Sequence, residues 1–129
     1  MEVIDVDEAA DLKQMLTAVG LADIEVLRMD GSLRAATGRP LTTVAEGRRL
    51  VSQFQAPTDT IAEGITVGGL TYVAAEADRR LLHGRRGGHG GVVAVNSPPY
   101  IVVARYDEGH RPADAVLSVA NLADLLAGG

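Results

Sequence analysis

The pattern of apolar and polar positions divides the chain into helical segments at its ends and near its middle, and a long region of strands. Apolar side chains recur every three or four positions in three segments. Acidic residues begin the first helical segment and Gly20 ends it. A capping box, Thr43-x-x-Glu46, begins the second segment, and Pro57 ends it. Pro112 begins the third segment. The predicted helices cover residues 5–19, Val44–Gln55 and Ala113–Ala127.

Alternating or short apolar runs predict strands in the rest of the chain. The first two runs are joined by Asp30-Gly31, a tight-turn signal, and form a hairpin. The later runs are separated by glycines or polar turns that are too short for crossover helices, so the sheet is antiparallel. The predicted strands are Asp23–Asp30, Leu33–Ala36, Ile65–Val67, Leu70–Ala75, Arg80–His83, Val92–Val95 and Tyr100–Tyr106.

This order of elements predicts an α+β fold, in which helices cover a central antiparallel sheet. A length of 129 residues fits one core. We therefore expect residues 1–129 to form a single domain.

Composition narrows the class of protein. The chain is 47% hydrophobic and 22% charged, as globular proteins are, and no apolar run approaches the ~18 residues of a membrane span. The acidic start Met1–Asp5 is unlike a basic signal peptide, which predicts an intracellular protein. The absence of cysteine excludes disulfides, thiolate nucleophiles and cysteine-based zinc sites.

Charge is distributed unevenly along the chain. A net charge of −5 argues against non-specific nucleic-acid binding. Acidic residues gather in residues 1–11, whereas residues 79–86 hold four arginines and no acid. We expect one basic face on an acidic molecule.

Candidate catalytic and metal-binding residues are few. A zinc site would need His83, His89 and His110 to converge from separate loops, or two of them with a carboxylate. Ser97 lies outside a G-x-S-x-G pattern, and no nucleophile and base form a recognisable pair. We predict no metal, no cofactor and no enzymatic activity.

The turn Arg85–Gly91 has two interpretations. Its glycines expose backbone amides and its arginines add charge, which suits an anion. It lacks the Lys-Ser/Thr of a nucleotide-binding loop, and no helix follows it. A hairpin loop that requires positive φ explains the same glycines.

Five pieces of sequence between Gly64 and Leu126 span about half of the chain. They are Gly64–Gly69 with Tyr72, Gly84–Gly87, Gly90–Val95, Tyr106–Glu108 and Arg111–Leu126. In this order they are similar to GLxLGGxKY, RGKKG, GGITI, IYDEP or IYEEP, and TPGQCNMVVERLGDYL. These are motifs of the profilin family, the small actin-monomer-binding proteins, which the second half of the chain therefore resembles.

The resemblance implies a profilin-like fold and an actin-like partner. The fold would be a sheet of about six or seven strands, with the terminal helices on one face and a small helix on the other. The partner would be monomeric actin or an actin homologue, bound by apolar patches with arginines at the rim. The corresponding positions are Thr71, Val73, Ala75, Arg85, Arg86, Arg111, Asp114, Leu117 and Asn121.

Departures from the family pattern bear on its other ligands. Profilins bind proline-rich peptides between aromatics of the terminal helices, whereas this chain has Val3, Ile4, Val6 and Leu125 there and no Trp. Since stacking on polyproline needs flat rings, we predict weak or absent polyproline binding. Val116 replaces an asparagine of the family's last helix. The family also binds phosphoinositides. Arg85 and Arg86 could contact such a lipid here, although the net charge of −5 disfavours binding of an anionic headgroup.

We therefore expect a monomeric, cytoplasmic, cytoskeleton-associated profilin, divergent and prokaryotic, that modulates actin-type filament assembly without a full polyproline groove. The alternative is a profilin-like or roadblock-like interaction module that regulates another partner, such as a small GTPase. A dimer in solution would favour this alternative.

Overall fold

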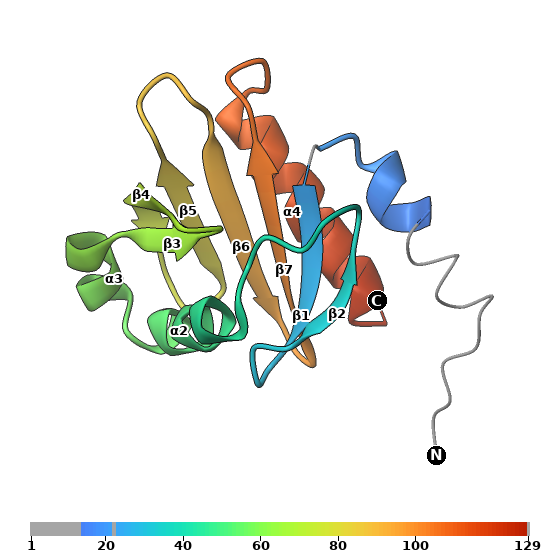
Figure 1. Cartoon of the computed structure of the whole chain (residues 1–129), viewed down its shortest axis with the longest axis horizontal. Helices are drawn as coiled ribbons and strands as arrows, with labels where there is room; N and C mark the ends of the chain where they lie inside the picture. The colour runs from blue at the N-terminus through green and yellow to red at the C-terminus, as the bar shows by residue number, and fades with distance from the viewer. Residues whose placement is uncertain (1–13, 22, 129) are drawn as a thin grey trace.

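Seven antiparallel strands form a single sheet in the computed structural model, which describes residues 14–21 and 23–128. The strands lie in the order β2-β1-β7-β6-β5-β4-β3, so the first hairpin joins the later meander through β1 and β7 (Figure 1). The strands are β1 (Asp23–Arg28), β2 (Leu33–Ala36), β3 (Ile65–Val67), β4 (Leu70–Ala77), β5 (Leu81–Arg85), β6 (Gly91–Ser97) and β7 (Tyr100–Tyr106).

Helices cover both faces of the sheet. The C-terminal helix α4 (Pro112–Leu126) packs on one face together with residues 14–18, which are helical. On the other face lie α2 (Val44–Gln55) and α3 (Pro57–Glu63) (Figure 1). The predicted α+β class, antiparallel sheet and arrangement of helices are confirmed. Most of the helix predicted over residues 5–19 lies outside the described residues.

Strand alternation produces two separate cores. In β6, Val93 and Val95 face α4, whereas Val92 and Ala94 face α2. Both sets are fully buried, so the central strands read as continuous apolar runs. The α4 core includes Leu16, Ile24, Val26, Val102, Ala104, Tyr106, Ala115, Val119 and Leu122; the α2 core includes Leu27, Leu50, Phe54, Ile65, Val67, Tyr72, Leu82, Ile101 and Val103.

The sequence pattern did not predict α3. Pro57 ends α2, as expected, but it also occupies the first turn of the next helix. The segment has no apolar periodicity. Its aliphatic residue Ile61 is half exposed, so no apolar face marks the helix. Its anchor is the buried Thr60, whose Oγ1 donates to the carbonyls of Gln53 and Ala56. A polar residue therefore fixes this helix, and hydropathy does not reveal it.

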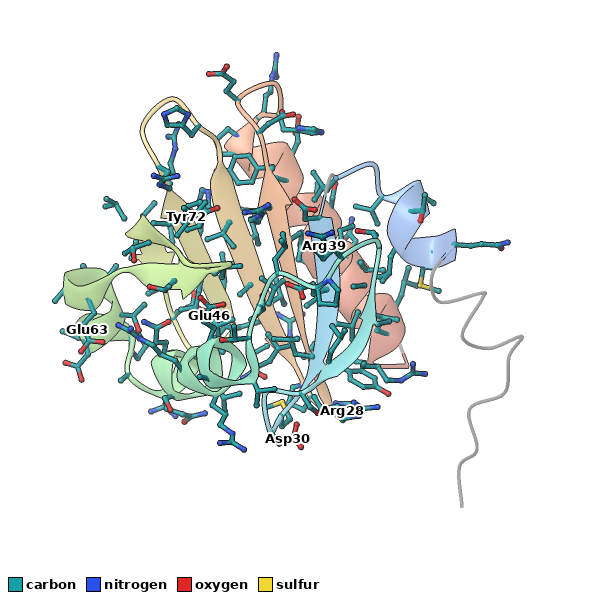
Figure 2. The ribbon with its side chains drawn as sticks, viewed as in Figure 1. Arg28, Asp30, Arg39, Glu46, Glu63 and Tyr72 are labelled. Carbon is teal, nitrogen blue, oxygen red and sulfur yellow. The ribbon has the colours of Figure 1, made fainter. Side chains whose placement is uncertain are left out.

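Glu46 joins α2 to the turn between β3 and β4. Its carboxylate completes the predicted capping box with Thr43 and accepts hydrogen bonds from the amides of Gly68 (3.1 Å) and Gly69 (2.9 Å) (Figure 2). Both glycines have positive φ, which allows the two amides to converge on one side chain. The paired glycine is thus needed to place β4 against the rest of the sheet.

Strand β4 changes its ladder partner along its length. Residues Leu70–Tyr72 pair with β3, and Val73–Ala77 pair only with β5 among the described residues. A bulge between Ala74 and Glu76 interrupts the pairing with β5. The second half of β4 is therefore an edge of the sheet.

Gly91 allows the ring of Tyr106 to cross the sheet. The two residues are paired between β6 and β7, and a Cβ atom on Gly91 would lie 2.4 Å from the Tyr106 hydroxyl and 2.4 Å from the carbonyl oxygen of Gly84. Because no side chain intervenes, the Tyr106 hydroxyl reaches His83 on β5, 2.6 Å from its Nε2 atom. The predicted end of β5 at His83 was too early, since Gly84 and Arg85 continue this ladder.

The substitution Gly91→Ala should lower the free energy of unfolding by about 2–3 kcal/mol, because the added methyl group overpacks a backbone contact. Urea denaturation measures the change. The control is Gly88→Ala in the same hairpin, where the nearest atom to an added Cβ is the Glu108 carboxylate at 3.7 Å. Equal stabilities of the two variants would contradict this account of Gly91.

Candidate partner-binding surface

One side of the molecule leaves the ends of two strands uncovered. Helix α4 packs over β6 and β7, and β4 and β5 lie beyond it. The register pairs Val73 with Arg85 and Glu76 with His83, so these four side chains share one face of the sheet. We call the exposed surface that carries Val73, Arg85 and the α4 residue Leu117 the docking face.

Two large apolar side chains stand out on the docking face. Val73 is 74% exposed and Leu117 is 60% exposed, the two highest values among the large hydrophobic residues of the described chain. Exposed apolar side chains that gather on one surface are typical of a protein interface. Both residues were predicted as partner-binding positions from the resemblance.

An open groove of about 530 Å³ separates α4 from β4 and β5. We call it the α4 groove. Its α4 wall is apolar, and its strand wall carries Glu76 and His83. The α4 residues in the wall are Pro112, Ala113, Val116, Leu117 and Ala120.

His83 forms a buried polar floor beneath this groove. Its side chain is 6% exposed, with Nε2 bonded to the Tyr106 hydroxyl and Nδ1 3.8 Å from a carboxylate oxygen of Glu76. Burial lowers the pKa of His83, the carboxylate of Glu76 opposes that shift, and Arg85 adds to it. Burial also raises the pKa of Tyr106. The sequence analysis considered His83 only as a possible zinc ligand, because a single histidine in an apolar strand gives no motif for another role.

The structure separates Arg85 from Arg86, which the sequence presents as one basic turn. Arg85 is exposed on the docking face beside Val73. Arg86 lines a different pocket of about 280 Å³ with Tyr72, His89 and Arg105. In that pocket Arg105 is paired with Asp23 at 2.9 Å. The two arginines therefore serve different surfaces.

The other predicted partner-binding residues spread around this face. Thr71 and Ala75 are exposed on β4, and the hydroxyl of Thr71 bonds to that of Thr66. Arg111 is exposed directly before α4, and Asp114 is exposed in its first turn.

Asn121 lies farther round α4, in a second groove. This groove, of about 430 Å³, runs between residues 15–19 and α4, and we call it the helix-pair groove. Its lining is mainly aliphatic: Met15, Ala18, Val19, Ser118, Asn121, Leu122 and Leu125. Leu125, where the resemblance places an aromatic residue in the family, is exposed at its rim.

The described residues form neither a metal site nor a membrane-spanning helix. No three His, Asp or Glu side chains in residues 14–21 and 23–128 gather closely enough to hold a metal ion. Within the same residues, every helix is too short or too polar to cross a bilayer.

Comparisons with known proteins agree with this geometry. The Profilin family model matches residues 11–128. Profilin-2 of Dictyostelium discoideum is 37% identical over 112 residues, which cover 86% of this chain and 88% of that protein. The structure of Acanthamoeba castellanii profilin IA superposes with a TM-score of 0.84 at 30% identity, over 93% of this chain and 96% of that one.

A more distant structure shares the fold alone. LokiProfilin2, solved in complex with rabbit actin, superposes with a TM-score of 0.72 at 16% identity, over 97% of this chain and 98% of that one. The prokaryotic source expected from the sequence stays a prediction. The family match, the curated relative and the shared seven-stranded sheet lead to the same conclusion: the chain belongs to the profilin family.

Proposed function

We propose that this protein binds monomeric actin, or an actin homologue, through the docking face and thereby modulates filament assembly. The observation that carries the proposal is that the two most exposed large apolar residues described belong to one surface: Leu117 lines the α4 groove, and Val73 lies on β4, the strand whose Glu76 lines the opposite wall. Similarity to a profilin solved in complex with rabbit actin supports the class of partner. Profilins are not enzymes, and neither is this chain.

The proposed interface has an apolar centre and a charged rim. Val73, Leu117 and the α4 groove form the centre, where desolvation is most complete. Arg85 and Arg111 lie at the rim, where they pair with carboxylates of the partner and steer the encounter. We place Thr71, Ala75, Asp114 and Asn121 at the periphery and assign Arg86 a minor part, because it lines another pocket.

The proposal extends to the state of the protein. We infer one domain over residues 1–129, a monomer in solution, and a cytoplasmic location beside the cytoskeleton that the partner forms. Phosphoinositide contact through Arg85 and Arg86 stays a prediction. A dimer without affinity for actin would favour the interaction-module alternative.

We also propose that polyproline binding is weak or absent. Recognition of a polyproline helix uses flat aromatic walls, against which the proline rings pack. The described lining of the helix-pair groove contains aliphatic, methionine and small polar side chains. Leu125 at its rim offers contact area and no planar surface.

The substitution Val73→Asp should weaken the binding of monomeric actin by about 1.5–3 kcal/mol, because it places a charge in the desolvated centre. Sedimentation or fluorescence titration with labelled monomers measures the affinity. The control is Val44→Asp on α2, an exposed valine on the opposite face of the sheet. Similar losses in both variants would locate the interface elsewhere.

The double substitution Arg85→Ala/Arg86→Ala should weaken binding by about 1–3 kcal/mol through lost charged hydrogen bonds. The structure predicts that Arg85→Ala alone gives most of this loss. Stopped-flow mixing with actin at two salt concentrations measures the effect on the association rate. Arg49→Ala on α2, which removes an exposed pair with Glu63, is the control. A dominant effect of Arg86→Ala would reverse this assignment.

A polyproline peptide should bind with a dissociation constant weaker than ~1 mM, because the described groove offers no ring for stacking. Calorimetry or chemical-shift titration measures the affinity. Leu125→Tyr adds one aromatic side chain at the rim and should increase the response. Micromolar affinity of the unaltered chain would disprove the proposed loss of this site.

A further inference from the structure

The floor of the α4 groove holds a titratable group with a single well-defined partner on each side. The Nε2 atom of His83 is 2.6 Å from the hydroxyl of Tyr106, and its Nδ1 atom faces Glu76 at 3.8 Å. His83 is buried, whereas the Glu76 side chain is 63% exposed. The imidazole is therefore shielded from water chiefly on its sheet side.

The groups that face His83 come from every element around it. Strand β4 contributes the carboxylate of Glu76, β5 the neighbouring charge of Arg85, and β7 the hydroxyl of Tyr106. Its partner in the β6 ladder is the apolar Val93. The α4 wall of the groove contributes no titratable side chain. Glu76 is thus the one anion in this set, and it lies beyond hydrogen-bond distance.

We propose that docking of an apolar partner surface onto the α4 groove requires neutral His83, so that partner binding is coupled to release of a proton and weakens as the pH falls. This inference rests on the proposed function, because the event that is coupled to proton release is actin binding at the docking face. It makes His83 the residue that sets the pH range in which the docking face operates.

The hydrogen bond to Tyr106 favours the neutral form. A neutral imidazole can accept the Tyr106 proton on Nε2, whereas an imidazolium has only donors. Protonation would therefore force Nε2 to donate and leave the buried Tyr106 hydroxyl to find another acceptor. An unsatisfied buried hydroxyl destabilises the state that contains it.

Partner docking increases the same bias. An apolar surface over the groove excludes the water that still reaches the His83 side chain, which is 6% exposed, and loss of water disfavours the charged form. The exposed Glu76 side chain keeps its hydration by turning away from such a surface, and this takes the one nearby anion away from His83. The pKa of His83 should therefore be lower in the complex than in the free protein.

The direction of the pH dependence follows from this difference. Burial already holds the pKa of free His83 below its ordinary value of 6.5. Above that value the imidazole is neutral in both states, and its contribution to affinity does not change with pH. As the pH falls through the pKa of the free protein, affinity falls by up to about tenfold per pH unit for one proton, and it levels off below the pKa of the complex.

The test compares pH slopes between the unaltered protein and His83→Gln, which cannot titrate and can still bond to Tyr106. Affinity for rabbit actin, held monomeric by a sequestering drug, is measured from pH 8.0 to pH 5.5. Only the ratio of the two affinities is used, so the pH response of actin itself cancels. We expect the affinity of the unaltered protein to fall relative to that of His83→Gln as the pH decreases below 6.5, by up to about tenfold per pH unit.

A second measurement does not depend on the substitution. NMR titration of the imidazole signals gives the pKa of His83 in the free protein and in the complex, and His89→Gln and His110→Gln identify the other two signals. We expect the pKa of His83 to lie below 6.5 in the free protein and to decrease on binding. The substitution Glu76→Gln should lower the pKa of His83 in the free protein further, because it removes the one nearby anion.

The outcomes separate this inference from the proposed function. Binding at pH 8.0 with equal slopes for both proteins, or a His83 pKa that rises on binding, would overturn the proton coupling and leave actin binding intact. No binding by the unaltered protein at any pH would overturn the proposed function, and the coupling to actin with it. An unchanged pKa of His83 on binding would likewise overturn the coupling, whatever its value in the free protein.

Discussion

The docking face depends on the close approach of the Tyr106 ring to Gly91. This contact lets a side chain from β7 pass over β6 and reach β5, which ties three strands together on the α4 side. Tyr106 also belongs to the core beneath α4, with Ala115 and Val119. One aromatic ring therefore links these strands to the helix that forms the apolar wall of the α4 groove.

A second set of contacts fixes the opposite layer and holds β4 in place. The buried carboxylate of Glu25 accepts hydrogen bonds from the amides of Leu41 and Thr42 and from the Thr42 hydroxyl, which orders the segment before α2. Glu46 then connects α2 to the turn that begins β4. Charged groups bonded to several backbone donors at once thus position the strand that carries Val73.

Much of the fold could be predicted from the sequence, because its signals are local. Capping at Thr43, Pro112 at a helix start and the Asp30-Gly31 turn each act within a few residues. Helix α3 and the continuation of β5 through Gly84 escaped prediction because they depend on distant contacts: Thr60 bonds to α2, and a Cβ at Gly84 would lie 2.7 Å from the Cβ of Tyr72. For the proposed site, the resemblance predicted Val73 and Leu117, which are the two most exposed large apolar residues described. The resemblance grouped Arg85 with Arg86, although neighbouring side chains at a strand end point to opposite sides. The resemblance contained no signal for His83.

The bulge in β4 has a further consequence. Residues Val73–Ala77 have a ladder partner on one side, and an edge strand is a template on which another chain can add. Helix α3 packs against β4, and the irregularity between Ala74 and Glu76 interrupts the regular ladder and increases the local twist. Strand β4 can therefore expose Val73 without offering a matching ladder to a second copy of the chain.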